Sequence, residues 1–217
     1  MSDLREVLRE IDVFAGELPD FDVSGAPGDP HELFTEWLLD ALRSGVREPH
    51  AMTVSTTGLD GNPSARVLIC KNVTPDGWQF AADAGSRKGR ELTGSGAAAL
   101  TFYWSPLARQ VRVRGTVVAG SPEESAADFL ARSPGARAEA LLGRQSTPLS
   151  DLAARDTDVR AAAERIAADP GLVAPGWTLY TLRAEEVEFW QGDKERRHTR
   201  LDYRRTDAGW ERGLLWP

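Results

Sequence analysis

The sequence predicts an α+β protein built on an antiparallel β-barrel with peripheral helices. From residue 51 onward, several short β segments are joined by tight turns, and helices are inserted late in the chain. The chain contains neither a Gly-rich dinucleotide loop nor a Walker loop. These observations favour an antiparallel barrel over a parallel doubly wound sheet, and NAD or ATP sites of those kinds are not expected.

The first strong element is a helix that begins after Asp29. Asp29 is a suitable N-cap, Pro30 suits the first helical position, and Gly45 ends the helical spacing of apolar residues. Residues 1–30 are charged at their start and rich in Gly, Pro and Asp at their end, so they predict a flexible N-terminal arm. We expect residues 31–217 to form a single domain.

The remaining elements follow from periodicity and capping signals. In the segment from 109, valines alternate with arginines, which predicts one dry and one wet face. Ser121 and Glu124 form a capping box that opens a helix through Leu130, and a further helix is expected at 151–168. Strands are predicted at 51–57, 64–71, 77–83, 97–104, 109–120, 177–192, 197–205 and 210–217.

Composition limits the possible functions. The 217 residues carry a net charge of −7, one Cys and three His. Disulfides and multi-thiolate metal sites are excluded, no metal centre is expected, and redox chemistry would need an organic cofactor. The acidic balance argues against nucleic-acid binding. The N-terminal stretch lacks the long uncharged core of a signal peptide or membrane span, so a cytoplasmic protein without a membrane partner is expected.

The segment Gly85-Ser86-Arg87-Lys88 follows a predicted strand directly. Ser86 can cap a helix whose first turn then carries two cations, where positive charge opposes the helix dipole. An anion bound at the helix N-terminus explains that placement. A solvated turn with basic residues is the alternative interpretation.

Two further segments combine cations with strands. Arg66 and Lys71 mark the ends of one predicted strand, and their spacing of five places them on opposite faces. The segment Glu188-Phe189-Trp190-Gln191-Gly192 precedes Arg196, His198 and Arg200, which share one face if that stretch is a strand. It offers a flat apolar wall beside cations and a titratable group. The alternatives are solvated strand ends and an exposed basic hairpin.

These segments together resemble the pyridoxamine 5'-phosphate oxidase family, whose members are FMN-binding split-barrel flavoproteins. The resemblance runs from about residue 31 to the C-terminus. Its motifs occur in the family's order: R-x-x-x-x-K (66–71), G-S-R-K (85–88), R-Q-V-x-V-x-G (109–115), R-Q-S (144–146), E-F-W-Q-G (188–192), R-x-H-x-R (196–200) and a W-x-x-x-x-L-x-P end (210–217).

The resemblance implies an antiparallel FMN-binding split β-barrel and a homodimer with FMN at the subunit interface. The FMN contacts of one subunit would be Arg66, Lys71, Arg87, Lys88 and the backbone near Ala81 and Ala82. Those of the other subunit would be Gln110, Gln145, Ser146, Trp190 and Arg200.

The implied reaction is hydride removal from a C–N bond of a small heterocyclic substrate, with molecular oxygen as the acceptor. Arg196 and His198 match the family's substrate-site residues. Arg196 would orient an anionic or phenolic group, and His198 would hydrogen-bond to the substrate or assist proton movement.

The sequence departs from the family at the site that grips a substrate phosphate. Lys71 and Arg132 match two of the family's four residues, but Asp128 stands in place of a Tyr and Ala136 in place of a Ser. An Asp near a dianionic phosphate is repulsive. This favours the branch of phenazine biosynthesis, whose oxidases aromatise reduced tricyclic carboxylates.

Two alternatives are weaker. Retention of Lys71 also fits a pyridoxine/pyridoxamine 5'-phosphate oxidase that makes pyridoxal 5'-phosphate. The second alternative is a split-barrel protein that binds flavin without turnover.

Overall fold

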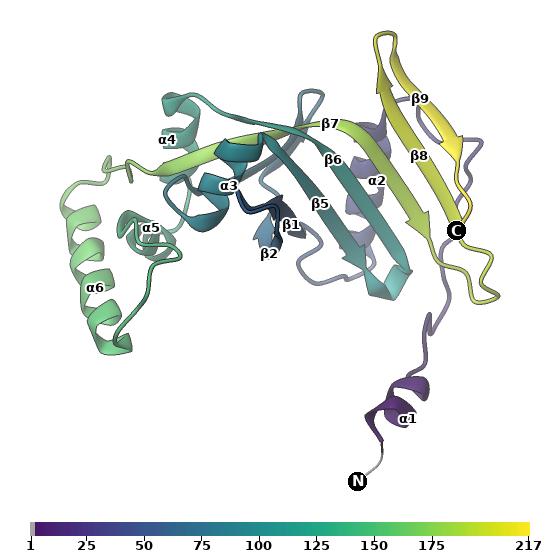
Figure 1. Ribbon diagram of the computed structural model, residues 1–217, viewed down its shortest axis with the longest axis horizontal. Coiled ribbons are helices and arrows are strands. Elements are labelled where there is room, and N and C mark those ends of the chain that lie inside the picture. Colours follow the sequence, from purple (N-terminus) through teal and green to yellow (C-terminus); the bar gives the residue numbers. More distant parts are fainter. Residues whose placement is uncertain (1–2) are drawn as a thin grey trace. The chain divides into compact units, whose positions relative to one another are not determined.

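The computed structural model describes residues 3–217. Its elements are α1 (Leu4–Arg9), α2 (Pro30–Arg43), β1 (Ala51–Thr57), β2 (Pro63–Ile69), β3 (Asn72–Thr74), β4 (Gly77–Asp83), α3 (Arg87–Ser95), β5 (Ala97–Trp104), a 3₁₀ turn (Ser105–Leu107), β6 (Arg109–Ala119), α4 (Pro122–Leu130), α5 (Pro134–Leu141), α6 (Leu152–Ala168), β7 (Trp177–Gln191), β8 (Thr199–Thr206) and β9 (Gly209–Leu214) (Figure 1).

In the described part of the chain, the strands form one sheet of order β2-β1-β5-β6-β7-β4-β3, and β8 pairs with both β7 and β9. The pairs β1–β2, β3–β4, β4–β7, β7–β8 and β8–β9 are antiparallel. The predicted α+β class with an antiparallel barrel sheet and peripheral helices is therefore confirmed. No helix among residues 3–217 has the length and apolar character needed to cross a membrane.

The chain divides into two compact units, and each is described by itself. Unit 1 contains the chain up to His50 together with Thr101–Val113 and Glu186–Pro217, and unit 2 contains Ala51–Leu100 and Arg114–Glu185. The predicted division into an arm of residues 1–30 and a domain of residues 31–217 stays a prediction. Residues 1–2 of that arm lie outside the described residues.

The core of unit 1 is rich in aromatic side chains, and helix α2 contributes several of them. The predicted cap is present, since Asp29 Oδ1 accepts a hydrogen bond from the backbone N of His31 at 2.8 Å. On the buried face of the helix, the Phe34 ring packs 4.8 Å from Phe102, and Trp37 packs 5.2 Å from Phe189. The apolar residues at helical spacing thus face the strands of unit 1.

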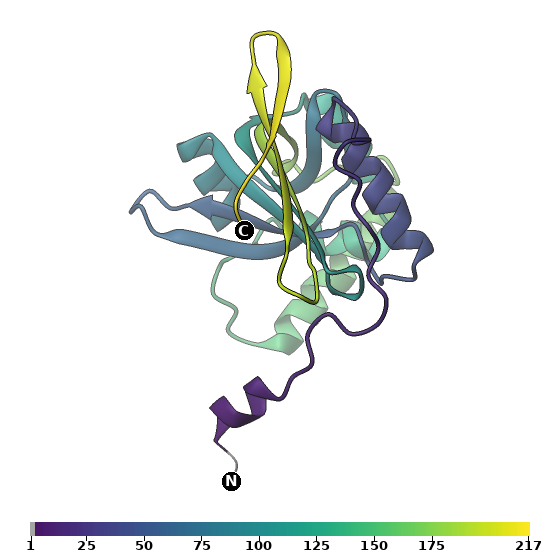
Figure 2. The same cartoon turned by 90° about the vertical axis from the view of Figure 1, so that its right-hand side faces the viewer.

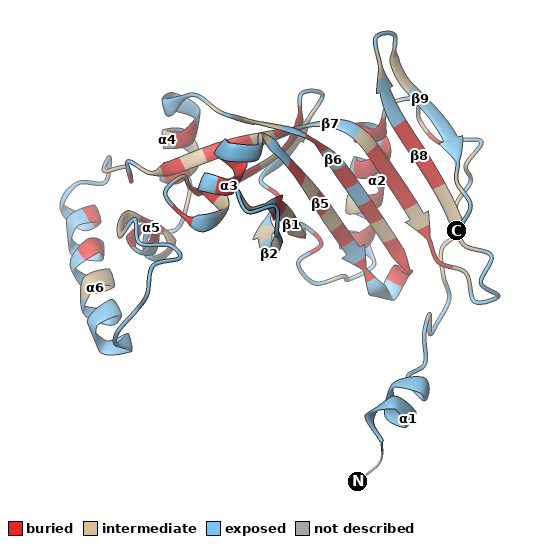
Figure 3. Ribbon diagram, in the orientation of Figure 1, coloured by how far each residue is buried: buried red, intermediate tan, exposed pale blue. Residues whose placement is uncertain are grey.

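The segment before α2 also belongs to unit 1. Helix α1 was not predicted; Asp3 caps it, and none of its residues is buried (Figure 3). The chain then runs alongside α2 (Figure 2), where the Phe21 ring lies 4.9 Å from Trp37. This contact fixes the end of the segment that leads into the helix.

Unit 2 places its helices around the strands that carry the candidate site. The capping box at the start of α4 is confirmed, because Ser121 and Glu124 exchange hydrogen bonds. At the other end of α4, the Phe129 ring lies 6.0 Å from Trp177, the first residue of β7. Helices α5 and α6 lie beside each other (Figure 1) and share a small apolar core around Ala138, Ala162 and Ile166.

Strand β2 is shorter than predicted. It ends at Ile69, and the backbone N of Lys71 donates to the carbonyl of Gln79 at 2.7 Å before the short β3 begins. Lys71 therefore lies beyond the strand, and the prediction that Arg66 and Lys71 occupy opposite faces of one regular strand is wrong. Strand β3 and helix α5 were both missed.

Strand β8 begins at Thr199, two residues later than predicted. Arg196 closes a turn with a left-handed φ of 67°, and its backbone N donates to the carbonyl of Asp193 at 3.1 Å. Arg196 and His198 thus precede the strand. The prediction that they share one strand face with Arg200 is wrong, because the turn interrupts the period of two.

Candidate active site

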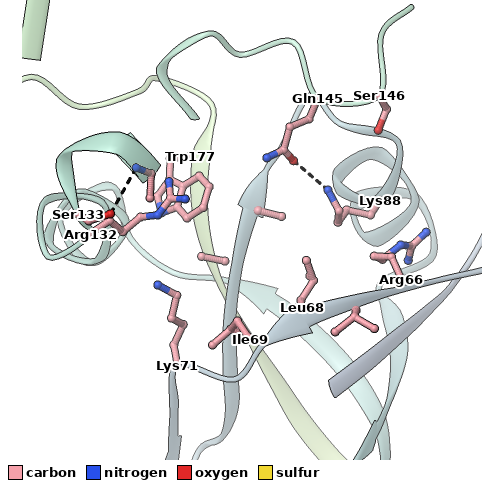
Figure 4. Close-up of a pocket in the computed structure, with 14 residues that line it drawn as sticks. Arg66, Leu68, Ile69, Lys71, Lys88, Arg132, Ser133, Gln145, Ser146 and Trp177 are labelled. Carbon is pink, nitrogen blue, oxygen red and sulfur yellow. Dashed lines mark hydrogen bonds between the residues drawn. The ribbon is translucent and has the colours of Figure 1, made fainter. Parts of the chain in front are cut away.

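A cavity of about 720 Å³ lies within unit 2 and gathers most of the site residues predicted there (Figure 4). Its walls come from strands β2 and β4, from the first turn of α3, from the region joining α4 to α5, from the loop after α5 and from the start of β7. The predicted residues that line it are Arg66, Lys71, Ala81, Ala82, Lys88, Arg132, Ala136, Gln145 and Ser146. Gln145 and Ser146 were predicted to reach the cofactor from the other subunit, but the loop after α5 places them in the same cavity as Arg66 and Lys88 of their own chain.

The N-terminus of α3 forms one positively charged end of the cavity. Ser86 caps the helix as predicted, since its Oγ accepts from the backbone N of Gly89 at 3.2 Å. Lys88 Nζ donates to Gln145 Oε1 at 2.9 Å (Figure 4). Burial and the nearby Arg66 lower the pKa of Lys88. The charge of Lys88 is therefore poorly solvated, and the first turn of α3 holds no acidic residue that could match it.

Glu91 organises this end from behind and was missed by the sequence analysis. Its buried carboxylate accepts from Thr56 Oγ1 at 2.5 Å, from Arg66 Nη2 at 3.1 Å and from Arg87 Nε at 2.7 Å. The Thr56 hydrogen bond, followed by those from the two arginines, lowers the pKa of Glu91. The spacing of four between Arg87 and Glu91 was the one available signal for this pair.

Arg87 does not line the cavity with its side chain. The guanidinium binds Glu91, while the backbone N of Arg87 donates to Ser146 Oγ at 3.2 Å. Ser146 lines the cavity. Arg87 therefore supports the lining residues Arg66 and Ser146, and its predicted direct contact with a cofactor stays a prediction.

The opposite end of the cavity carries a second charged cluster. Lys71 Nζ lies 3.2 Å from Asp128 Oδ1, and Asp128 Oδ2 accepts from Trp177 Nε1 at 2.8 Å. The Arg132 guanidinium lies over the Trp177 ring, 4.0 Å from its centroid (Figure 4). Burial lowers the pKa of Arg132. Asp128 is not itself in the lining, and it acts on the cavity through Lys71 and Trp177.

Trp177 is the second residue that sequence reasoning missed. It starts β7 and is 8% exposed, with its ring between Arg132 and the apolar side of α4. Nothing in the sequence distinguishes it from an ordinary core aromatic at the start of a strand.

Between the two charged ends, Leu68 and Ile69 give the cavity an apolar floor (Figure 4). The cavity thus has two separate ends with cationic side chains, joined by an apolar surface.

The remaining predicted residues belong to unit 1. Trp190 and His198 contact each other with ring centroids 5.0 Å apart, and the Phe14 ring lies 5.7 Å from His198. His198 Nδ1 accepts a hydrogen bond from the backbone N of Asp193 at 3.0 Å. In the neutral imidazole the proton therefore lies on Nε2.

Arg200 is held firmly in unit 1. It donates to the buried carboxylate of Glu188 through Nη2 at 2.7 Å and to the backbone carbonyl of Trp216 through Nη1 at 2.6 Å. Gln110 is half-buried on β6, and Arg196 is exposed on its turn. None of these three residues lines the unit 2 cavity.

The fold and the cavity define a split-barrel protein with a site of clustered cations. Residues 38–191 match the family model for pyridoxamine 5'-phosphate oxidase, and residues 177–217 match that for the pyridoxine 5'-phosphate oxidase C-terminal dimerisation region. The chain belongs to the pyridoxamine 5'-phosphate oxidase family and is a flavoprotein oxidoreductase of that family.

The following similar proteins carry two different names. Proteins named pyridoxine/pyridoxamine 5'-phosphate oxidase from Rubrobacter xylanophilus and Thermosynechococcus vestitus are 40% and 42% identical; the alignments cover 89% of this chain in both cases and 89% and 92% of those proteins. Among solved structures, PhzG from Burkholderia lata 383, in complex with tetrahydrophenazine-1-carboxylic acid, is 31% identical with a TM-score of 0.84. That match covers 93% of this chain and 100% of PhzG.

Proposed function

We propose that this protein is an FMN-dependent oxidase that removes hydride from a reduced N-heterocycle, in a late oxidation or aromatisation step of phenazine-type secondary metabolism. The observation that carries the proposal is the ion pair between Lys71 and Asp128 at 3.2 Å. A substrate phosphate would meet a lysine whose charge is already matched, beside a carboxylate that repels a dianion. The likeness to PhzG supports the same choice.

The residues present fit FMN in two ways. The cavity end at α3 presents Lys88 and a helix N-terminus without an acidic residue in its first turn, which suits a phosphate. The methyl side chains of Ala81 and Ala82 let a flat ring approach the β4 backbone. FMN, when bound, supplies the electron acceptor, and molecular oxygen re-oxidises it.

In the proposed homodimer, the partner subunit's unit 1 completes the site. Gln110, Trp190 and Arg200 would contact the cofactor, and Arg196 and His198 would contact the substrate. Arg200 is prepared for this role, because Glu188 and the Trp216 carbonyl fix its guanidinium. His198 would donate from Nε2 to a substrate nitrogen or oxygen, since its Nδ1 is already occupied. The match of residues 177–217 to a dimerisation region supports this arrangement.

Pyridoxine/pyridoxamine 5'-phosphate oxidation is the second candidate function. The relatives at 40% and 42% identity carry that name, and Lys71 and Arg132 are both present in the cavity. Asp128 and Ala136 count against it, because neither donates a hydrogen bond to a phosphate. The loss of two buried donors costs about 1–3 kcal/mol each.

Anaerobic reduction of the bound flavin separates the two functions. The holoenzyme is mixed with a dihydro- or tetrahydrophenazine carboxylate or with pyridoxine 5'-phosphate, and loss of the flavin absorption is followed by stopped flow. We expect the reduced phenazine to bleach the flavin at least about a hundredfold faster than pyridoxine 5'-phosphate, given the missing phosphate donors. Faster reduction by pyridoxine 5'-phosphate would contradict the proposal.

A further inference from the structure

The cations that line the cavity differ in how far their charges are already matched. Arg66 is paired with Glu91 at 3.1 Å, and Lys71 is paired with Asp128 at 3.2 Å. The Arg132 side chain makes no hydrogen bond or ion pair to any residue that the structure describes, and its Nη1 is buried without a partner. Such a donor group is costly unless a ligand satisfies it.

Asp128 holds the two residues on either side of Arg132. One carboxylate oxygen neutralises Lys71, and the other fixes the Trp177 indole against which the Arg132 guanidinium lies. The Asp128 side chain is 14% exposed, so solvent screens its charge only weakly. Lys71, Arg132 and Asp128 together therefore carry a single net positive charge. The charge of Glu139 also acts on Arg132, but Glu139 is exposed, so solvent screens it more strongly than Asp128.

We propose that Asp128 is a specificity-determining residue that sets this end of the cavity for a monoanionic aromatic carboxylate, which Arg132 binds beside the Trp177 ring. The inference rests on the proposed function and deepens it. A carboxylate matches the one free cation of this described cluster, and its aromatic ring matches the apolar floor of Leu68 and Ile69. A dianionic phosphate would leave one negative charge unmatched beside Asp128.

The size of the effect follows from the charges. Removing the negative charge of Asp128 favours any anion nearby, but a dianion gains about twice as much Coulomb energy as a monoanion at the same distance. The substitution Asp128→Asn preserves an acceptor for Trp177 Nε1 and frees Lys71. The preference for phosphate over carboxylate should therefore rise, while the wall formed by Trp177 and Arg132 stays in place.

The test measures binding by calorimetry on the oxidised holoenzyme, without turnover. Phenazine-1-carboxylate and pyridoxal 5'-phosphate are the probes. In Asp128→Asn, we expect the ratio of pyridoxal 5'-phosphate affinity to phenazine-1-carboxylate affinity to rise about tenfold or more. In Arg132→Lys, which keeps the charge but loses the planar donor pair, we expect phenazine-1-carboxylate to bind about tenfold more weakly.

Asp156→Asn is the matched control, because Asp156 is an exposed carboxylate paired with Arg155 at 2.7 Å on α6. Its affinity ratio should equal that of the wild type. An unchanged ratio in Asp128→Asn, or wild-type carboxylate binding in Arg132→Lys, would overturn the inference. Failure of the proposed function has a different signature, which is rapid flavin reduction by pyridoxine 5'-phosphate in the wild-type enzyme.

Discussion

At the scale of single residues, Glu91 illustrates how a buried carboxylate prepares a cationic site. Arg66 alone would place a guanidinium in a half-buried position with many possible rotamers. Hydrogen bonds to Glu91, Thr56 and Ser64 restrict it to one orientation at the cavity wall. The same carboxylate also binds Arg87. Glu91 is thus a positioning residue that orients Arg66 and Arg87. Its negative charge also offsets part of their positive charge.

The substitution Glu91→Gln tests this role through pH. The pKa of Glu91 is lowered in the folded protein, so its ionised form stabilises the fold above the unfolded-state pKa of about 4.3. This contribution disappears as pH falls through the folded-state value. We expect the variant to be about 1–3 kcal/mol less stable at pH 7, with the difference from wild type shrinking below about pH 4.

Urea unfolding of both proteins at several pH values measures that difference. Asp158→Asn provides a control, because the exposed pair of Asp158 with Arg144 should contribute little at any pH. A stability gap between Glu91→Gln and wild type that is constant from pH 7 to pH 3 would contradict the role of the ionised carboxylate.

At the scale of elements, helix α3 is the part of the site that local sequence determines most fully. Ser86 caps it, and Arg87 and Lys88 occupy its first turn without an acidic neighbour there. These features are local, so the sequence alone predicted the helix, its cap and its cationic first turn, and the anion bound there stays a prediction. The structure shows that the two cations have different positions. Lys88 faces the cavity, whereas Arg87 supports Arg66 through Glu91.

The double substitution Arg87→Ala and Lys88→Ala should abolish FMN retention while the fold survives. The two cations oppose the helix dipole, and Glu91 keeps its hydrogen bonds to Thr56 and Arg66 when Arg87 is removed, so we expect the fold to persist. We expect FMN affinity to fall at least about a hundredfold, because the charge-assisted phosphate contact of Lys88 would contribute roughly 1.5–3 kcal/mol and Arg66 loses the support that Arg87 gives it through Glu91. Flavin fluorescence titration measures the loss, and circular dichroism checks the fold. Wild-type FMN affinity in the double variant would refute the phosphate assignment.

Elements that depend on distant contacts were harder to predict. Helix α2 and strands β1, β4 and β5 match their predicted bounds closely, because capping and alternation are local signals. Lys71 was predicted to lie inside a strand, but β2 ends at Ile69 and the backbone of Lys71 bonds to Gln79, a contact that is distant from local sequence signals. The Asp193–Arg196 turn needs a left-handed backbone conformation at Arg196, and no residue pattern in the sequence predicts that conformation.

In the candidate site, too, local features could be predicted from the sequence and distant contacts could not. Residue types at fixed spacing identified most of the cavity lining, but the partners that orient those side chains come from other elements. Asp128 reaches Lys71 and Trp177 only because α4 lies against the start of β7. The sequence places Asp128 and Lys71 more than fifty residues apart, so their pairing is a product of the fold.

At the scale of the whole molecule, the predicted cofactor contacts are divided between the two units. Arg66, Lys71 and Lys88 line the unit 2 cavity, whereas Gln110, Trp190 and Arg200 belong to unit 1. Under the proposed homodimer, each FMN site takes its first set from one subunit and its second set from the partner. Two variants that are defective on opposite sides should then repair each other in a mixed dimer.

Co-expression of the Arg87→Ala/Lys88→Ala variant with Arg200→Gln tests this sharing. Each mixed dimer would hold one site with both defects and one intact site. Random assembly makes about half of the dimers mixed, so about a quarter of all sites should retain FMN, whereas neither variant alone retains it.

Co-expression with Arg66→Ala is the control, because both defects then lie on the same side and no intact site can form. Flavin content per protein, measured after tandem affinity purification of mixed dimers, should rise to about one FMN per dimer in the first pair. Mixed dimers that remain without FMN would contradict a site shared between subunits.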